Sequence, residues 1–493
     1  MSVESQRVSR TVVTAKADIH RVLRLAAGAV AGNLLVVLAT PLITRLYTPQ
    51  DYARWILCIS YVSILGTVAS LRYENAVVLP KSHRDAVHAA ALAIFCSFVV
   101  GCLSFLPLVL FSGKLSSVLS TDVTWLSLSW IPALVFLTGL SQTCLSWCTR
   151  SQWFGLSSIA NACSALLLVL SQIVAAKLGY TTFWGLVVGS IIGQGGTTLI
   201  LCCWIVFCER RSLKLISIKH LYVTAREYKN FPIYLTPYSI VGVIRERISL
   251  FFLNSWATQA VVGNFALAQR MTALPGGLIS GSIRPVLFQK ASTEESQSVL
   301  QFIEGARATL LQLSTPFVIL FLFYAQDLFA LIFGGQWRDG GIYAQILALP
   351  AFMFLFSDWT DRVLDVLGRQ KLALKMEFVF SFLNVAVLFL SFWLTGNAFI
   401  AITLQALVVA LFHGYWLYAV YRAARFPTIR LLRSALSFLC LCALYSGVLL
   451  IIRPLFPVWL ACGIYSLLAA GWIAWLLFKK KIHLSGAKTF GFR

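Results

Sequence analysis

Long blocks of apolar residues alternate with short polar segments along all 493 residues of the chain. Most blocks reach ~20 residues, the length at which a helix crosses the hydrocarbon core of a membrane. Helices are expected rather than strands, because backbone groups inside a bilayer must satisfy their hydrogen bonds within the segment itself. The pattern therefore predicts an all-α polytopic membrane protein with about fourteen transmembrane helices. The predicted spans are 22–43, 52–71, 86–111, 123–148, 155–176, 182–207, 231–254, 260–288, 306–326, 341–366, 373–394, 398–420, 434–452 and 456–478.

A polar and basic stretch at 208–230 divides these spans. Six helices precede it and eight follow it. The first six of those eight form the second half, so both halves begin on the same side of the membrane. Two such halves form a parallel repeat, related by an axis along the membrane normal. The predicted segments are a cytoplasmic N-terminal segment (1–21) without the pattern of a cleavable signal, an N-lobe (22–207), a cytoplasmic linker (208–230), a C-lobe (231–420), two C-terminal helices (421–478) and a basic cytoplasmic tail (479–493).

Composition and charge narrow the class of protein. Hydrophobic residues make up 59% of the chain and charged residues 12%, which excludes a soluble enzyme, a disordered protein and a fibrous protein. The net charge is +22, but the basic residues lie between apolar blocks rather than in one patch, so no nucleic-acid partner is expected. With a cytoplasmic N-terminus, twenty-six Lys and Arg fall in loops on the cytoplasmic side and five on the other. The positive-inside rule then places both termini in the cytoplasm.

The twelve cysteines fall almost entirely inside the apolar spans. They form no C-x-x-C pair and no histidine lies at zinc-ligand spacing, so packing residues are expected rather than disulfides or a metal site. No nucleotide-binding Gly-rich loop and no catalytic pair of carboxylates occurs. The sequence therefore predicts neither an enzyme nor a cofactor.

Several stretches match a known family in their order and spacing. They are Thr40–Tyr52 (TPLITRLYTPQDY), Leu71–Pro80 (LRYENAVVLP), Tyr228–Tyr234 (YKNFPIY), Val262–Arg270 (VGNFALAQR), Leu274-Pro275 and Leu328–Trp337 (LFALIFGGQW). Over roughly residues 20–420 the chain resembles the Wzx-type polysaccharide and O-antigen flippases, within the superfamily of multidrug, oligosaccharidyl-lipid and polysaccharide exporters.

The resemblance implies flipping of an undecaprenyl-pyrophosphate-linked oligosaccharide repeat unit across the bacterial inner membrane, for lipopolysaccharide or exopolysaccharide assembly. It implies two lobes around a cavity, alternating access driven by an ion gradient, and three kinds of partner: the lipid-linked oligosaccharide, membrane lipids, and polysaccharide polymerase or export machinery. Two alternatives stay open, a multidrug or organic-cation exporter of the same superfamily and a membrane polysaccharide polymerase. An exporter of cations should have an acidic cavity, whereas the helices at 231–254 and 260–288 are net cationic.

Arginines inside predicted spans are candidates for binding the substrate pyrophosphate. Arg245, Arg247 and Arg270 lie near the middle of the membrane, and Arg24 lies at the cytoplasmic mouth of the first helix. An arginine at a helix centre costs ~2.5–3.5 kcal/mol on insertion scales, and its planar fork can bind phosphate bidentately. The competing interpretation is a packed ion cluster in which Glu246 pairs with one of them, with Arg24 as a snorkelling boundary residue.

Carboxylates and a Pro-Gly motif supply candidates for coupling and gating. Asp358 and Asp361 share one helix face and are predicted to carry a coupling ion or proton, although Arg362 lies four residues after Asp358 and could pair with it instead. Pro275, Gly276 and Gly277 are predicted to interrupt the span at 260–288 as a gate or hinge, with a static kink as the alternative.

Three further ionic residues, at two places in the chain, are interpreted as boundary residues. Arg72 and Glu74, at the end of the second span, are predicted to form an ion pair. Arg284, which precedes Pro285, is placed at the membrane interface. Neither position is assigned to the substrate or to coupling.

Overall fold

The fold is known from a computed structural model that describes residues 32–110 and 128–489, with side chains given except at 213–214, 458 and 475–489. The described residues are helical with short connections and contain no strand. Nine of their helices are long and apolar enough to cross a membrane, and shorter apolar helices cover Gly32–Leu46 and Trp459–Ala474. The predicted spans fall on helices in the described residues, although 86–111 is divided at Ser104 and 341–366 by a 3₁₀ turn at Asp358–Thr360. The chain is therefore an all-α polytopic membrane protein, as predicted.

The chain divides into two compact units, 1–266 and 267–493. The predicted parse into six, six and two helices stays a prediction. The helices of the first unit are α2 (Pro49–Thr67), α3 (His83–Leu103), α4 (Phe105–Leu110), α6 (Trp130–Arg150), α7 (Phe154–Lys177), α8 (Phe183–Glu209), α9 (Ile218–Glu227) and α10 (Thr236–Trp256). The second unit holds most of α11 (Gln259–Thr293), then α12 (Ser296–Phe333), α13 (Gly340–Ser357), α14 (Asp361–Val366), α15 (Gln370–Thr395), α16 (Ala398–Ala423), α17 (Ile429–Ile452) and α18 (Val458–Thr489).

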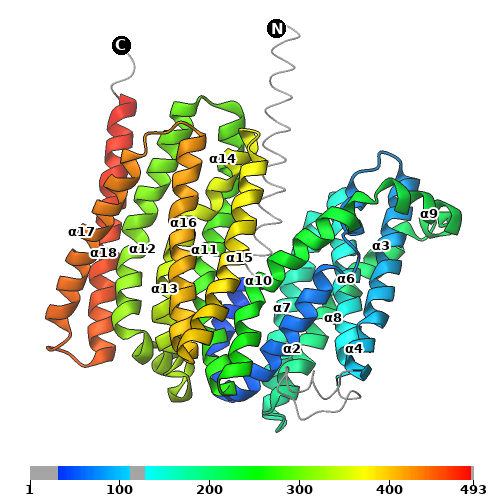
Figure 1. The fold of residues 1–493 in the computed structure, drawn as a ribbon, viewed down its shortest axis with the longest axis horizontal. Helices are drawn as coiled ribbons and strands as arrows, with labels where there is room; N and C mark the ends of the chain where they lie inside the picture. Colours follow the sequence, from blue (N-terminus) through cyan, green and yellow to red (C-terminus); the bar gives the residue numbers. More distant parts are fainter. Residues whose placement is uncertain (1–31, 111–127, 490–493) are drawn as a thin grey trace, which may run out of the picture. The chain divides into compact units, whose positions relative to one another are not determined.

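Glycines let α7 and α8 approach closely within the first unit. A Cβ at Gly189 would lie 2.3 Å from the Gln172 side chain, and one at Gly193 would lie 2.8 Å from Leu168 Cβ. The Ser164 hydroxyl also donates to the Gly193 carbonyl over 2.9 Å. Inside a membrane the hydrophobic effect does little to hold helices together, so close van der Waals packing matters more. Small residues allow that close packing. In the same unit α6 packs between α3 and α8 (Figure 1).

The stretches that carry the family resemblance build contacts of the first unit. Thr48 caps α2 through the amide of Asp51, and the Asp51 carboxylate accepts from the amide of Phe183 at the start of α8 (3.0 Å). The predicted pair of Arg72 and Glu74 is confirmed, with 3.3 Å between Arg72 Nη1 and Glu74 Oε1. Arg72 Nε also donates to the Ser239 hydroxyl on α10 over 2.9 Å. The stretch therefore ties the end of α2 to α10.

Gly263, at the start of α11, lies against the start of α2. A Cβ at this position would lie 2.0 Å from the carbonyl oxygen of Pro49, and Arg54 Nε donates to Gln259 Oε1 beside it (3.0 Å). We expect Gly263→Ala to lower the free energy of unfolding by about 1–3 kcal/mol, the usual cost of forcing a group into a filled site. Thermal unfolding in detergent, followed by size-exclusion chromatography, measures the effect.

Gly281→Ala is the matched control, because this glycine lies on the same helix with nothing within 4 Å of its Cβ position. There alanine is expected to be neutral or stabilising by up to about 1 kcal/mol through helix propensity. Equal melting temperatures for the two variants would contradict the close approach at Gly263.

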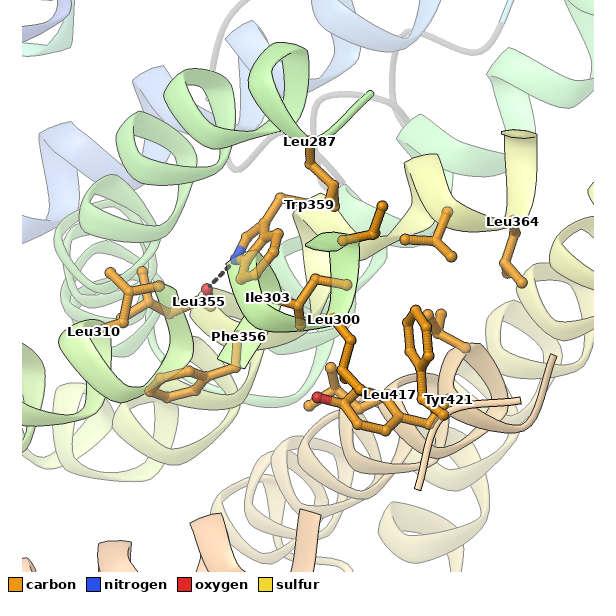
Figure 2. Packing of buried hydrophobic residues seen from close by; sticks show 14 of the residues in the cluster. Leu287, Leu300, Ile303, Leu310, Leu355, Phe356, Trp359, Leu364, Leu417 and Tyr421 are labelled. Carbon is orange, nitrogen blue, oxygen red and sulfur yellow. Dashed lines mark hydrogen bonds between the residues drawn. The ribbon is translucent and has the colours of Figure 1, made fainter. Parts of the chain in front are cut away.

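In the second unit, α13 packs between α12 and α16, and α15 packs on α16. A buried apolar cluster that includes Trp359 joins these helices. Figure 2 shows Leu287 and Ile303 near Trp359, and Leu417 beside Tyr421. Trp359 is fully buried, and its indole N–H donates to the carbonyl of Leu355 over 2.9 Å. This anchor fixes the short 3₁₀ turn Asp358–Thr360 between α13 and α14.

Candidate functional site

A network of charges lies where α11 meets the turn after α13. Arg284 Nη2 is 3.0 Å from Asp358 Oδ2 and 3.2 Å from Asp361 Oδ2, while its Nε donates to Asp361 Oδ1 over 3.3 Å. The hydroxyl of Ser280, one turn earlier on α11, donates to Asp358. One guanidinium therefore bridges the two carboxylates that the sequence singled out for coupling.

The fold positions this network through the Trp359 side chain. Because Trp359 is locked in the apolar cluster, the residues on either side of it, Asp358 and Thr360, have little freedom. Thr360 is buried as well, and its hydroxyl donates to the Ser357 carbonyl over 2.6 Å. Leu287 reaches the same cluster one turn after Arg284 and so brings α11 against the turn (Figure 2).

The ion pairs differ from those expected on α14. The alternative pair of Arg362 with Asp358 does not form, since Arg362 Nη1 lies 2.8 Å from Asp365 Oδ2 and its Nε 3.7 Å from Asp361 Oδ1. Asp358 belongs to the 3₁₀ turn before α14 rather than to the same α-helix, so helical spacing does not bring it to Arg362. Asp358 pairs instead with Arg284, which the sequence placed at the membrane interface without a role.

The Pro275-Gly276-Gly277 segment does not interrupt its helix. α11 continues from Gln259 to Thr293 with Pro275 and Pro285 inside it, so the predicted interruption is wrong. Gly276 is a packing residue, because a Cβ there would lie 2.6 Å from the Phe354 ring on α13, whereas Gly277 has open space. A hinge at this segment stays a prediction.

The candidate phosphate-binding arginines lie on two helices. Arg245 and Arg247 are both half-buried on α10, ~200° apart around its axis. The Nε of Arg247 is buried and has no hydrogen-bond partner among the described residues. Arg270 is half-buried on α11, and both it and Arg245 interact with other groups of the protein. Arg24 lies outside the described residues.

A second ion cluster, which the sequence did not suggest, joins α12 to α16. Arg307 is 5% exposed, and its Nη1 donates to the Tyr421 hydroxyl over 2.8 Å and lies 3.4 Å from Glu304 Oε1. Tyr421 is fully buried and donates to Glu304. The spacing of Glu304 and Arg307 on one helix was a signal for part of this cluster, but Tyr421 is 114 residues away from Arg307.

The part of the chain that the structure describes contains no cluster of side chains suited to bind a metal ion. No three His, Cys, Asp or Glu side chains gather there as metal ligands would. The sites that remain are thus ionic, built from arginine, carboxylate and hydroxyl groups.

Comparison with known proteins assigns the fold and the family. Residues 42–340, more than half of the chain, match the family model described as polysaccharide biosynthesis protein. The probable low-salt glycan biosynthesis flippase Agl15 of Haloferax volcanii is 26% identical over 257 residues, which are 51% of each chain. The chain thus spans about half the length of this curated relative.

Solved structures share the architecture at low sequence identity. The lipid II flippase MurJ in an inward closed conformation matches with a TM-score of 0.69 at 13% identity, over 94% of this chain and all of its own. An inward-facing multidrug resistance MATE family transporter of the MOP superfamily matches with a TM-score of 0.62 at 13% identity, over 80% of this chain and 95% of its own. The MATE transporter VcmN of Vibrio cholerae, solved as a point mutant, matches with a TM-score of 0.56 at 16% identity, over 86% and 100%. The fold is therefore shared with the lipid II flippase and with the MATE transporters. The match over residues 42–340 shows that the chain belongs to the family of polysaccharide biosynthesis proteins.

Proposed function

We propose that this protein flips a polyprenyl-pyrophosphate-linked oligosaccharide across the bacterial inner membrane by alternating access. The observation that carries the proposal is the family match over residues 42–340, since a polysaccharide biosynthesis protein made of membrane helices fits translocation of a glycan precursor. The relative from Haloferax volcanii is named as a flippase for glycan biosynthesis, which supports the same reaction class. The lipid carrier of this oligosaccharide is proposed to be undecaprenyl pyrophosphate.

Arginines on α10 and α11 are proposed to bind the pyrophosphate. The substrate carries a diphosphate that must cross a medium of low dielectric constant, where an unpaired anion is very costly. Arg247 suits this role because its buried Nε has no partner among the described residues, so a ligand oxygen can complete its hydrogen bonding. Arg245, Arg270 and Arg24 are proposed as further contacts for the same headgroup.

Asp358 and Asp361 are proposed to couple the cycle to an ion gradient. Arg284 pairs with both carboxylates, so the site holds two negative charges around this one guanidinium. Uptake of a proton or Na⁺ by the carboxylates would weaken the hold on Arg284. Such an exchange can bias a transporter between two states, provided that the ion binds the two states with different affinities.

A multidrug exporter is the second candidate, favoured by the similarity to MATE transporters. Two features of the described residues distinguish the candidates. Organic cations need acidic side chains in the transport path, whereas α10 carries Arg245 and Arg247 against one acid, Glu246. The carboxylates of α14, Asp361 and Asp365, are already paired with arginines.

Rescue of a flippase-deficient bacterium tests the function and the phosphate role together. We expect the wild-type chain to restore surface glycan and Arg247→Ala to lower export about 10- to 100-fold, because a charge-assisted hydrogen bond contributes about 1.5–3 kcal/mol. Arg247→Lys keeps the charge but loses the planar fork, so it should retain partial activity. Surface glycan per cell, normalised to protein level in the membrane, measures both.

Arg422→Ala is the control, since this arginine is exposed at the end of α16. It should export at the wild-type rate. Full export by Arg247→Ala would reject the phosphate role but leave flipping standing. A wild-type chain that restores no glycan, yet protects cells from organic cations, would favour the exporter.

A further inference from the structure

A short amphipathic helix, α9, lies within the basic segment that precedes α10. It spans ten residues, Ile218–Glu227, and it packs on α3. It is too short and too polar to cross a membrane, so it needs another environment for its apolar side chains.

One arc of α9 is fixed to the bundle of the first unit. Leu221 and Ala225 pack against a buried cluster that includes Tyr73 and Leu92. The Tyr73 hydroxyl donates to the carbonyl of Ala225 over 3.2 Å, and Thr224 is buried in the same contact. Leu92 lies on α3 within a predicted membrane span (His83–Leu110), so α9 flanks this span near its first turns. The helix is therefore held against the side of the bundle.

The exposed arc of α9, which begins beside the packed arc at Ile218, carries large apolar side chains. Ile218 is 86% exposed, Tyr222 is 72% exposed and Val223 is 54% exposed. Ile218 and Tyr222 are four residues apart and so lie above one another on the helix surface. Three exposed apolar side chains in ten residues indicate contact with something less polar than water.

Basic side chains share the exposed arc. Lys219 and Arg226 are exposed on the helix, and Lys229 is exposed just after its end. Arg210 and Arg211 are exposed directly after α8. The acidic groups nearby are fewer: Glu209 accepts from Ser212 and lies 3.2 Å from His83, Asp85 lies in the first turn of α3, and Glu227 lies at the edge of the arc. Apolar and basic side chains interleaved on one face are typical of a helix that lies in a membrane interface rich in anionic lipid.

We propose that α9 lies in the membrane interface and binds the headgroups of anionic phospholipids through Lys219, Arg226 and Lys229, while Ile218 and Tyr222 insert among the acyl chains. Charge complementarity identifies this occupant, because a positively charged face selects acidic headgroups, whereas apolar contact alone would accept any lipid. The site does not depend on flipping, and it adds a lipid-sensing contact to the segment that leads into α10.

Photo-crosslinking of the full chain in lipid nanodiscs tests this assignment. The variants carry p-benzoylphenylalanine at Tyr222 or, as a second position, at Ile218, with Glu227 as the control position on the same helix. The nanodiscs contain equal amounts of phosphatidylglycerol and phosphatidylcholine, and mass spectrometry identifies the adducts. We expect lipid adducts at Tyr222 and Ile218, several-fold fewer at Glu227, and an excess of phosphatidylglycerol.

Removing the charges separates the electrostatic part from the apolar part. Lys219→Ala with Arg226→Ala should lower the ratio of phosphatidylglycerol to phosphatidylcholine adducts by roughly fivefold or more, since each basic residue near an anionic surface contributes about a factor of five. High salt should have the same effect. Adducts to protein instead of lipid, equal lipid adducts at Tyr222 and Glu227, or adducts in proportion to the lipid mixture would each overturn the proposal.

Discussion

Replacing Arg307 with alanine is expected to lower the free energy of unfolding of this protein by about 2–4 kcal/mol, slightly below the usual cost of breaking a buried pair, because Glu304 keeps some solvent contact. Arg307 donates to the Tyr421 hydroxyl and lies against Glu304, and its guanidinium sits 5.6 Å from the centre of the Tyr421 ring. Alanine leaves the Glu304 charge without its cation and opens a void between α12 and α16. Thermal and denaturant unfolding in detergent, read by size-exclusion chromatography, measures the loss.

Two variants separate the charge from the volume. Replacing both charges, Glu304→Gln with Arg307→Met, should recover most of the loss, because a buried pair contributes little over a well-packed neutral replacement. Lys290→Ala is the exposed control: Lys290 Nζ lies 2.8 Å from Glu294 Oε1, and its hydrogen bond lowers the pKa of Glu294 below the usual range. That pair faces water, so its loss should barely change stability. Equal losses for Arg307→Ala and Lys290→Ala would contradict the buried role of Arg307.

The helices of this fold could be read from the sequence because membrane spans obey a simple length rule. An apolar block of ~20 residues must become a helix in lipid, whatever its neighbours are. The length rule does not fix the ends: the span predicted at 52–71 begins at Pro49, where Thr48 caps the helix. The rule does not apply to α9, whose ten residues are too few and too polar for a membrane span. It also fails at Pro275, where the helix continues because neighbouring helices can support a proline inside a membrane.

The candidate site could be read only in part, because periodicity identifies a helix face but not the partner opposite it. The spacing of Asp358 and Asp361 correctly singled out two carboxylates, yet their shared cation is Arg284, 74 residues before Asp358 and on another helix. Helical spacing offered Arg362 as an alternative partner for Asp358, but Arg362 pairs with Asp365. Arg307 and Tyr421 were missed for the same reason, since no local pattern links them.

Replacing Arg284 with alanine is expected to lower stability by about 1–3 kcal/mol and to impair glycan export beyond that loss. The two carboxylates of Asp358 and Asp361 would then face each other with only Arg362 nearby, 3.7 Å from Asp361. The cost is smaller than for a fully buried pair because these side chains keep about a quarter of their exposure. Asp358→Asn in the Arg284→Ala background removes one of the opposed charges and should restore part of the stability.

A double-mutant cycle on Arg284 and Asp358 measures this pairing directly, with an expected coupling of about 0.5–3 kcal/mol for residues in contact. The same cycle on Arg362 and Asp358 is the control and should give a value near zero, because Arg362 pairs with Asp365. The export assay then tests coupling: Asp358→Asn alone should weaken the dependence of glycan export on the ion gradient, whereas Arg362→Ala should leave it unchanged. Strong Arg284–Asp358 coupling with unaltered gradient dependence would make the network a structural bridge between α11 and α14 and would reject its role in energy coupling.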